Sequence, residues 1–413
     1  METRHHKMKI GLLAYHAACN MGATLQLLST YSYLKNSGHA PIVINWVAED
    51  LEKMYERAVP KEQQELQLQL RRTLWKETAL CRTSEDVARV INDEGIQAVI
   101  VGSDAVAQNH PVLERLHIDV HKLIKIDRIT SDRVFPNPFW GEFNRFLEKP
   151  VPVAMLSGSS QDSHFRLIPS VHCKQMKLAI EKFSYISVRD SWTQDMIAYI
   201  TSHSIVPPVT PDPVFAFNYN ADDLIPSKQT ILKKYNLPEK YFVFSFLNNS
   251  DVSQEWLSEF EKMSTAKEIA CVSLPFAHKP SFGHFEHTIN MPLSPLDWFA
   301  LIKYSQGYIG NNMHPIIVSI HNNVPFFSFD NYGIRRFHNL ITSDKSSKIL
   351  HILRKAGLDE YRISVINRHK ISPSPAEVFN KLILFPLAKE KAFAAEWQNE
   401  YLTMMQQILS KLQ

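Results

Sequence analysis

Several short polar segments of the chain carry the residue types that acid–base and anion-binding chemistry require, and each follows a short apolar run. Apolar runs of this length are typical of buried strands. Ligands of open α/β sheets bind beyond the carboxyl ends of the strands, so these segments are the first place to look for a site. They are residues 20–26, Gly102-Ser103-Asp104, Ser157-Gly158-Ser159, Arg189-Asp190 and Gly310-Asn311-Asn312-Met313-His314.

The last of these segments offers an acid. Pro315 suits the first turn of a helix, which places His314 at the cap and aims the free backbone N–H groups of that turn at a ligand. A helix N-terminus favours an anion, and an imidazole beside an anion is stabilised in its protonated form. We therefore expect His314 to hold a proton near neutral pH and to deliver it to a substrate. The alternative is a capping histidine with no chemical role.

Each of two charged residues at other predicted strand ends could have either of two roles. Arg189 follows the strand expected over residues 185–188, where its guanidinium can bind a carboxylate or phosphate through two hydrogen bonds. Its alternative role is a salt bridge to Asp190 or to another residue of its domain. Asp104 either orients a sugar hydroxyl or caps the segment that follows it.

Metal and nucleotide cofactors are disfavoured by the motifs. His278, His284 and His287 share one loop, but their spacing matches no common zinc motif and a fourth ligand is missing. A loop that faces an acceptor is the better explanation. A single glycine, Gly22, follows the first predicted strand, whereas a dinucleotide fingerprint needs several. We therefore expect no metal and no cofactor.

The composition indicates a soluble globular protein. Of 413 residues, 45% are hydrophobic and 21% charged, and 45 Lys and Arg face 42 Asp and Glu, too small a surplus for a nucleic-acid binder. The apolar runs fall far short of the roughly 20 residues that cross a bilayer, and residues 1–7 show no secretory pattern. Scattered cysteines fit a reducing compartment. We expect a cytoplasmic protein, or one that is peripheral at the inner face of the cell membrane.

Strands alternate with helices over most of the chain, which predicts parallel sheets covered on both faces. Prolines crowd residues 205–240 and mark a connection between two such units. The sequence thus predicts an α/β protein with two Rossmann-like domains facing across a cleft, residues 8–220 and 221–372. Residues 373–413 are expected to form a C-terminal helical segment that packs back on the domains. Its apolar stripe is Phe393, Trp397, Tyr401, Met404 or Met405, and Ile408.

The order of these segments resembles that of the polysaccharide pyruvyl transferase family. The family's N-x-G-A-x-L-Q, V-x-V-G-S-D, small-residue S-x-G, I-S-V-R-[DE] and D-P elements all have matches here, in the expected order. A last motif, usually G-x-R-x-H, is followed by an apolar helix and a V-P-F strand. The matching residues are 20–26, 99–104, 157–159, 186–190, 212–213, 310–314 and 324–326.

The resemblance implies a fold like that of GT-B glycosyltransferases and transfer of a pyruvyl group from phosphoenolpyruvate to a sugar as a ketal. Such reactions belong to the synthesis of bacterial capsule, exopolysaccharide or cell-wall polysaccharide. The family's motif histidine corresponds to His314, as the catalytic acid, and its motif arginine after the I-S-V strand to Arg189, as an anion contact. The acceptor is expected to be a sugar carried on a lipid or on a nucleotide, and no metal is needed.

One position departs from the family pattern, because Asn312 stands where the last motif usually has arginine. Asn312 can donate a hydrogen bond but supplies no positive charge. The donor carries about three negative charges, so another cation has to help Arg189, His314 and the helix terminus, and Arg335 and Arg336 are the nearest candidates. The expected donor site is therefore Arg189, Asn312, His314, Arg335 and Arg336. The expected acceptor contacts are Asn20, Gln26, Asp104, Ser157 and His278.

Two other functions stay open from the sequence. The first is a GT-B glycosyltransferase that uses a nucleotide-sugar donor. The second is a non-catalytic carbohydrate-binding relative of such enzymes, a reading that the asparagine at position 312 favours.

Overall fold

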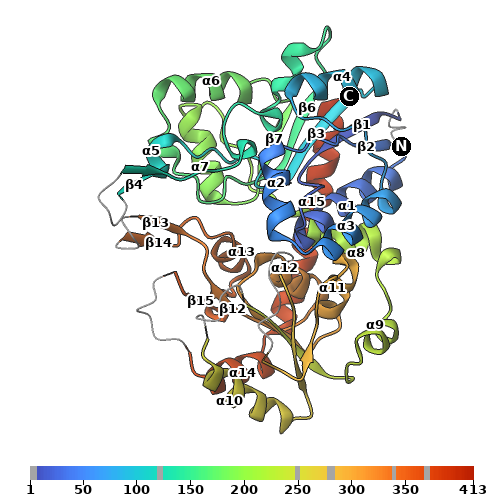
Figure 1. Ribbon diagram of the computed structural model, residues 1–413, viewed down its shortest axis with the longest axis vertical. Helices are drawn as coiled ribbons and strands as arrows, with labels where there is room; N and C mark the ends of the chain where they lie inside the picture. Colours follow the sequence, from blue (N-terminus) through green and yellow to red (C-terminus); the bar gives the residue numbers. More distant parts are fainter. Residues whose placement is uncertain (1–6, 119–123, 247–251, 277–283, 337–340, 367–372) are drawn as a thin grey trace.

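Two parallel sheets, one in each half of the chain, organise the computed structural model (Figure 1). The structure describes residues 7–118, 124–246, 252–276, 284–336, 341–366 and 373–413. Within them, the first sheet has five strands in the order β2-β1-β3-β6-β7 and the second has six in the order β10-β9-β8-β11-β12-β15. All strand pairs within these two sheets are parallel.

The first sheet is buried on both faces. Its strands are β1 (Lys9–Leu13), β2 (Ala40–Val43), β3 (Ala98–Asp104), β6 (Val153–Gly158) and β7 (Tyr185–Val188). Nearly every strand residue is buried, as expected where helices cover both faces. The helices of this half are α1 (Met21–Asn36), α2 (Glu49–Ala58), α3 (Lys61–Leu74), α4 (Ser84–Glu94), α5 (Val112–Arg115), α6 (Ser170–Ile180) and α7 (Ser191–Ile200), and a hairpin is formed by β4 (Leu116–Ile118) and β5 (Ile124–Ile126).

The second half repeats the alternation. Its sheet is formed by β8 (Tyr241–Ser245), β9 (Ala270–Ser273), β10 (His287–Thr288), β11 (Gly307–Gly310), β12 (Phe326–Asp330) and β15 (Arg362–Ser364). Its helices are α10 (Gln254–Thr265), α11 (Pro295–Lys303), α12 (Met313–Asn322), α13 (Lys348–Ala356) and α14 (Pro375–Ile383), with a hairpin of β13 (Ile334–Arg336) and β14 (Ile341–Ser343). The chain passes from the first sheet to the second through α8 (Phe217–Ala221) and α9 (Lys228–Tyr235).

Helix α1 lies where the two halves meet. It is buried on most sides from Met21 to Thr30, and it packs on residues 213–221 and on α11 as well as on its own sheet. A helix that is buried all round lies inside the protein rather than on one face of it. One continuous apolar core accordingly runs from β1 and α1 through Phe215 and Phe299 to α12.

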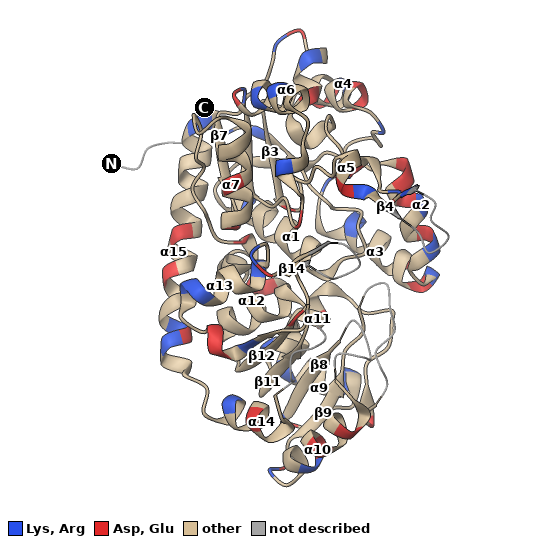
Figure 2. Ribbon diagram, turned by 90° about the vertical axis from the view of Figure 1, so that its left-hand side faces the viewer, with Lys and Arg blue, Asp and Glu red and all other residues tan. Residues whose placement is uncertain are grey.

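The C-terminal helix α15 (Leu387–Leu412) joins both halves. Its buried stripe includes Phe393, Trp397, Tyr401, both Met404 and Met405, and Ile408, all facing the shared core. It contacts β6 in the first half and α12 and α13 in the second. Figure 2 shows charged residues of α15 on its outward side, whereas Glu390 is buried. The predicted fold class, with two Rossmann-like units and a C-terminal helix, is confirmed.

None of the helices that the structure describes combines the length and the apolar character needed to span a lipid bilayer.

Candidate active site

The first turns of α1 and α12, one from each half of the chain, meet at His314. A Cβ atom added to Gly22 would lie 2.0 Å from Nδ1 of His314, so the imidazole rests directly on the glycine backbone. The side chain of Asn20 caps α1 by accepting hydrogen bonds from the backbone N–H groups of Gly22 and Ala23. His314 itself is only 5% exposed. The absence of a side chain at Gly22 is therefore what admits the ring to this position.

The start of α12 differs from the prediction. The helix begins at Met313 with Asn312 as its cap residue, so His314 is its second residue and Pro315 its third. Proline fits there because the N–H groups of the first turn have no partner within the helix. The predicted position of His314 at the cap is thus wrong by two residues, although the ring still lies at the N-terminus of the helix.

Buried charges surround the histidine. The Arg189 guanidinium is 2.9 Å from Oδ2 of Asp212 and 3.3 Å from Oδ1 of Asp104, and Nε2 of His314 is 3.7 Å from the same Asp212 oxygen. Gln26 donates a hydrogen bond of 2.5 Å to that oxygen. Asp104 and Arg189 follow two strands of the first sheet, which explains why their side chains converge at one edge.

Arg189 is already neutralised within the protein. Its side chain is 1% exposed and two carboxylates share its charge, so it holds Asp104 and Asp212 in place. This is the alternative role expected from the sequence, although the partner is not Asp190. The Asp190 carboxylate instead caps α7 through Thr193 and accepts a hydrogen bond from Ser159.

The ionisation of His314 also differs from the prediction. Burial lowers its pKa to about 4, and the attraction of Asp212 and Asp104 does not offset that cost; Arg189 and Lys348 lower it further. The expectation of a proton on His314 near neutral pH is therefore wrong for the protein alone. Within the described residues, Nε2 of His314 has no hydrogen-bond partner and is available for one.

The structure places some of the predicted acceptor contacts at the surface or in the cluster around Arg189, and encloses others completely. Asn20 is exposed at the cap of α1, and Asp104 lies in the cluster beside Arg189. Gln26 and Ser157 are fully enclosed, Gln26 by Asp212 and Ser103, and Ser157 by Thr210 and the Pro211 carbonyl oxygen. Those two support the cluster from behind rather than facing a ligand. His278 lies outside the described residues.

Of the three other predicted donor contacts, the structure describes the side chain of Asn312 alone. Asn312 is half-buried, and its side chain makes no capping hydrogen bond. Arg335 and Arg336 belong to β13, and their side chains lie outside the described part of the structure.

A cation that the sequence analysis missed is Lys348, at the first position of α13, with only 5% of its surface exposed. A lysine in the first turn of a helix is unfavourable, because its charge is repelled by the positive end of the helix dipole. This unusual position is the feature of the sequence that could have pointed to Lys348.

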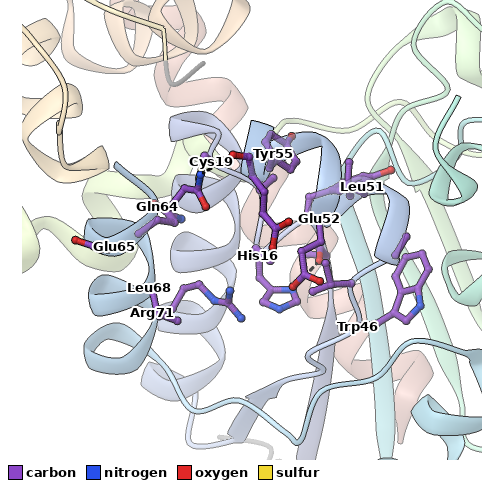
Figure 3. Close-up of a pocket in the computed structure, with 18 of the residues that line it drawn as sticks. His16, Cys19, Trp46, Leu51, Glu52, Tyr55, Gln64, Glu65, Leu68 and Arg71 are labelled. Atoms are coloured by element: carbon purple, nitrogen blue, oxygen red, sulfur yellow. Dashed lines mark hydrogen bonds between the residues drawn. The ribbon is translucent and has the colours of Figure 1, made fainter. Parts of the chain in front are cut away.

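A separate pocket of about 330 Å³ lies beyond β1 and β2 and is walled by α2 and α3 (Figure 3). The Arg71 side chain points toward His16. Arg71 donates a hydrogen bond of 3.2 Å to Oδ1 of Asn45, and Nε2 of His16 lies 2.8 Å from the same oxygen. Arg71 is also paired with Glu77, which balances its charge. Aromatic side chains form much of the remaining wall, namely Tyr15, Trp46, Tyr55 and Phe139.

The histidine loop offers no metal centre in the part that is described. His284 contacts the side chain of Gln254, and His287 belongs to the edge strand β10. No cluster of three His, Cys, Asp or Glu side chains among the described residues is placed to hold a metal ion.

Comparison with known proteins adds a family and a fold. A model of the family "Polysaccharide pyruvyl transferase" matches residues 20–332. Among curated proteins, none matches the chain significantly. Solved structures of similar fold include UDP-GlcNAc 2-epimerase from Neisseria meningitidis bound to UDP-GlcNAc, with a TM-score of 0.56 and 12% identity over 98% of this chain and 100% of that one. The UDP-GlcNAc 2-epimerase from Methanocaldococcus jannaschii gives a TM-score of 0.54 and 12% identity, covering 97% and 99% of the two chains.

Proposed function

The chain belongs to the polysaccharide pyruvyl transferase family, and from that premise we propose that it transfers the pyruvyl group of phosphoenolpyruvate to two hydroxyls of one sugar, forming a ketal. The reaction would serve bacterial capsule, exopolysaccharide or cell-wall polysaccharide synthesis. The observation that carries this proposal is the buried His314 with an unpartnered Nε2, 3.7 Å from Asp212, where the two halves of the chain meet.

The chemistry needs one proton donor. His314 protonates the methylene carbon of the donor, which becomes a methyl group, and the neighbouring carbon becomes electrophilic. A sugar hydroxyl adds to that carbon and gives its proton back to His314. The second hydroxyl then displaces phosphate, which leaves with the second hydroxyl proton. Two hydroxyl protons therefore account for the methyl hydrogen and for the protonated phosphate.

Donor binding allows His314 to take up a proton from solution. A pKa of about 4 leaves the imidazole neutral at pH 7. An anionic phosphate or carboxylate beside the ring stabilises the imidazolium and raises its pKa. Protonation is thereby coupled to donor binding. Arg189 is a positioning residue in this scheme, because it fixes the carboxylate of Asp212 near the ring.

The acceptor would enter from the first half of the chain. The pocket in Figure 3 adjoins Cys19, next to Asn20 at the start of α1, and its aromatic wall suits the apolar face of a sugar ring. Asn20 and Asp104 are the acceptor-side residues that we retain from the sequence. Action in the cytoplasm, or at the inner face of the membrane on a lipid-carried sugar, is part of the proposal.

The test is a reaction with phosphoenolpyruvate and a panel of lipid- and nucleotide-linked sugars. Phosphate release together with a mass gain equal to a pyruvyl ketal is expected. His314→Ala should abolish both while the melting temperature stays near that of the wild type. His321→Ala, which removes a half-buried histidine near the other end of α12, serves as the control. Full turnover of His314→Ala would remove this residue from the mechanism.

A nucleotide-sugar transferase is the second candidate, and a non-catalytic carbohydrate-binding protein the third. Thermal stabilisation by UDP but not by phosphoenolpyruvate would favour the second. Acceptor binding without phosphate release from any donor would favour the third.

A further inference from the structure

A cavity of about 240 Å³ is lined by residues from both halves of the chain. The loop after β6 supplies one wall, and the segment after β12 and the start of α13 supply the other. Its lining residues are Gln161, Asp162, Asn331, Tyr332, Gly333, Ser346 and Lys348.

Lys348 is a buried cation that has no direct ion pair within the described residues. It is 5% exposed, and in the described part of the chain its ammonium has neither an ion pair nor a hydrogen bond. Its Nζ lies 5.3 Å from the centroid of the Tyr332 ring, and the carboxylates of Asp104, Asp190 and Asp162 act on its charge from a longer range. Burial, helped by the nearby Arg189, lowers the pKa of Lys348 to about 8, so the side chain is still mostly charged at neutral pH. These carboxylates compensate the charge only in part, and a buried charge with no direct ion pair or hydrogen bond destabilises a protein, which favours a ligand as the missing partner.

The second polar group of the cavity is also unpartnered. The Ser346 hydroxyl is buried, with 4% of the residue exposed, and it has no hydrogen bond within the described residues. The adjacent Ser347 is engaged, because its side chain caps α13 at Leu350 and donates to Asp330. The N-terminus of α13 adds a positive partial charge behind Ser346 and Lys348. Asp162, the acid of the lining, is exposed.

The cavity is coupled to the proposed acid. Lys348 acts electrostatically on both His314 and Asp104, and the Tyr332 side chain is hydrogen-bonded to the backbone of Met313, the first residue of α12. An anion that compensates Lys348 would therefore also weaken the repulsion that opposes protonation of His314. The family's usual cation is missing from the last motif of this chain, where Asn312 stands.

We propose that this cavity binds the phosphate group of the donor, through the Lys348 ammonium and the Ser346 hydroxyl at the N-terminus of α13. Lys348 then supplies the positive charge that Asn312 cannot. The assignment rests on the proposed function for the identity of the donor, but the anion site follows from the cavity itself.

Binding of two probes to the full-length protein tests the proposal. Inorganic phosphate and phosphoenolpyruvate are titrated separately by calorimetry, in a buffer free of other phosphate and of sulfate. Lys348→Met should weaken both by about 10- to 100-fold, the range expected for a hydrogen bond to a charged group. Lys348→Arg should retain most of the affinity. The exposed Lys345, three residues earlier, provides the matched control Lys345→Met, which should bind as the wild type does.

A second readout separates ligand binding from a structural role. Because Lys348→Met removes an uncompensated buried charge, this variant should melt at a higher temperature than the wild type without added anion, and should gain less from phosphate. Unchanged affinity for phosphoenolpyruvate in Lys348→Met would overturn the proposal, and so would a wild type that binds neither probe. Phosphate binding that depends on Lys348, with no binding of phosphoenolpyruvate, would support the anion site and contradict pyruvyl transfer.

Discussion

Donor binding should draw about one proton from solution into the active site, and replacing His314 with glutamine should remove most of that uptake. The imidazole has a pKa of about 4 in the protein alone, because it is buried. It can act as an acid at neutral pH only if the bound donor raises that value. The proton must then arrive together with the donor.

The size of the required shift can be compared with what one charge supplies. Half-protonation at pH 7.5 needs a rise of about 3.5 units from a pKa of about 4, or roughly 5 kcal/mol. One unit charge about 4 Å from the ring contributes about 4 kcal/mol at the effective dielectric constant of a protein site. A donor with about three negative charges therefore suffices, even with Lys348 and Arg189 nearby.

Calorimetric titration at pH 7.5, in two buffers with different ionisation enthalpies, measures the uptake directly. A phosphate monoester has its second pKa near 6, so the donor itself exchanges few protons at this pH. We expect uptake of between half a proton and one proton by His314 in the wild type. In His314→Gln at most about a quarter of a proton should remain, because Lys348, with a pKa of about 8, is partly neutral at pH 7.5 and is protonated when the anion binds. His321 is a control on the same helix with the same lowered pKa of about 4, and His321→Gln should behave as the wild type. Tight donor binding without proton uptake would refute the role of His314 as the acid.

Two further substitutions test other parts of the structure. In Gly22→Ala the new Cβ would fall 2.0 Å from Nδ1 of His314, so turnover should drop at least about tenfold, at a stability cost of about 1–3 kcal/mol. The control is Gly11→Ala, whose new Cβ would lie 2.7 Å from the Ile44 side chain inside the first sheet. This control should lose similar stability and keep its activity. Glu390 is buried with both carboxylate oxygens unpartnered among the described residues, and burial raises its pKa to about 9. Below pH 4.5 the Glu390 carboxyl is neutral in both the folded and the unfolded state, and its contribution to the free energy of unfolding is largest. As the pH rises toward 9 the carboxyl ionises in the unfolded state first, so this contribution is lost. Glu390→Gln should therefore raise the unfolding free energy by up to about 3 kcal/mol at pH 7 and flatten its pH dependence, as measured by denaturant titration. Equal pH profiles for Glu390→Gln and the wild type would contradict this account.

Periodicity and strand-end residues predicted the two sheets and the C-terminal helix well, because apolar runs report burial directly. The run before Asp104 became β3 and the stripe from Phe393 to Ile408 became the buried face of α15. The edge strands β10 and β15 were missed, since two or three residues carry no periodic signal.

The site was only partly predictable, because charge compensation depends on contacts between distant segments. Asp212 is 23 residues from Arg189 and 186 from Gln26 along the chain, so no local pattern indicates that all three share one oxygen. The same limit applies to the pKa of His314, which is set by how completely both halves of the chain enclose the ring. Burial of Lys348 likewise becomes visible only when the loop after β6 closes over it.

The way α15 is anchored limits how the molecule can move and be divided. Its apolar stripe packs on β6 of the first sheet and on α12 and α13 of the second half. Truncation before Leu387 would therefore expose apolar surface on both halves at once and should destabilise the whole chain. Because α15 holds the two halves together along one side, we expect the cavity at Lys348 to open by a rotation of one half against the other. Such a rotation would separate His314, in the second half, from Asp104, Arg189 and Asp212, in the first.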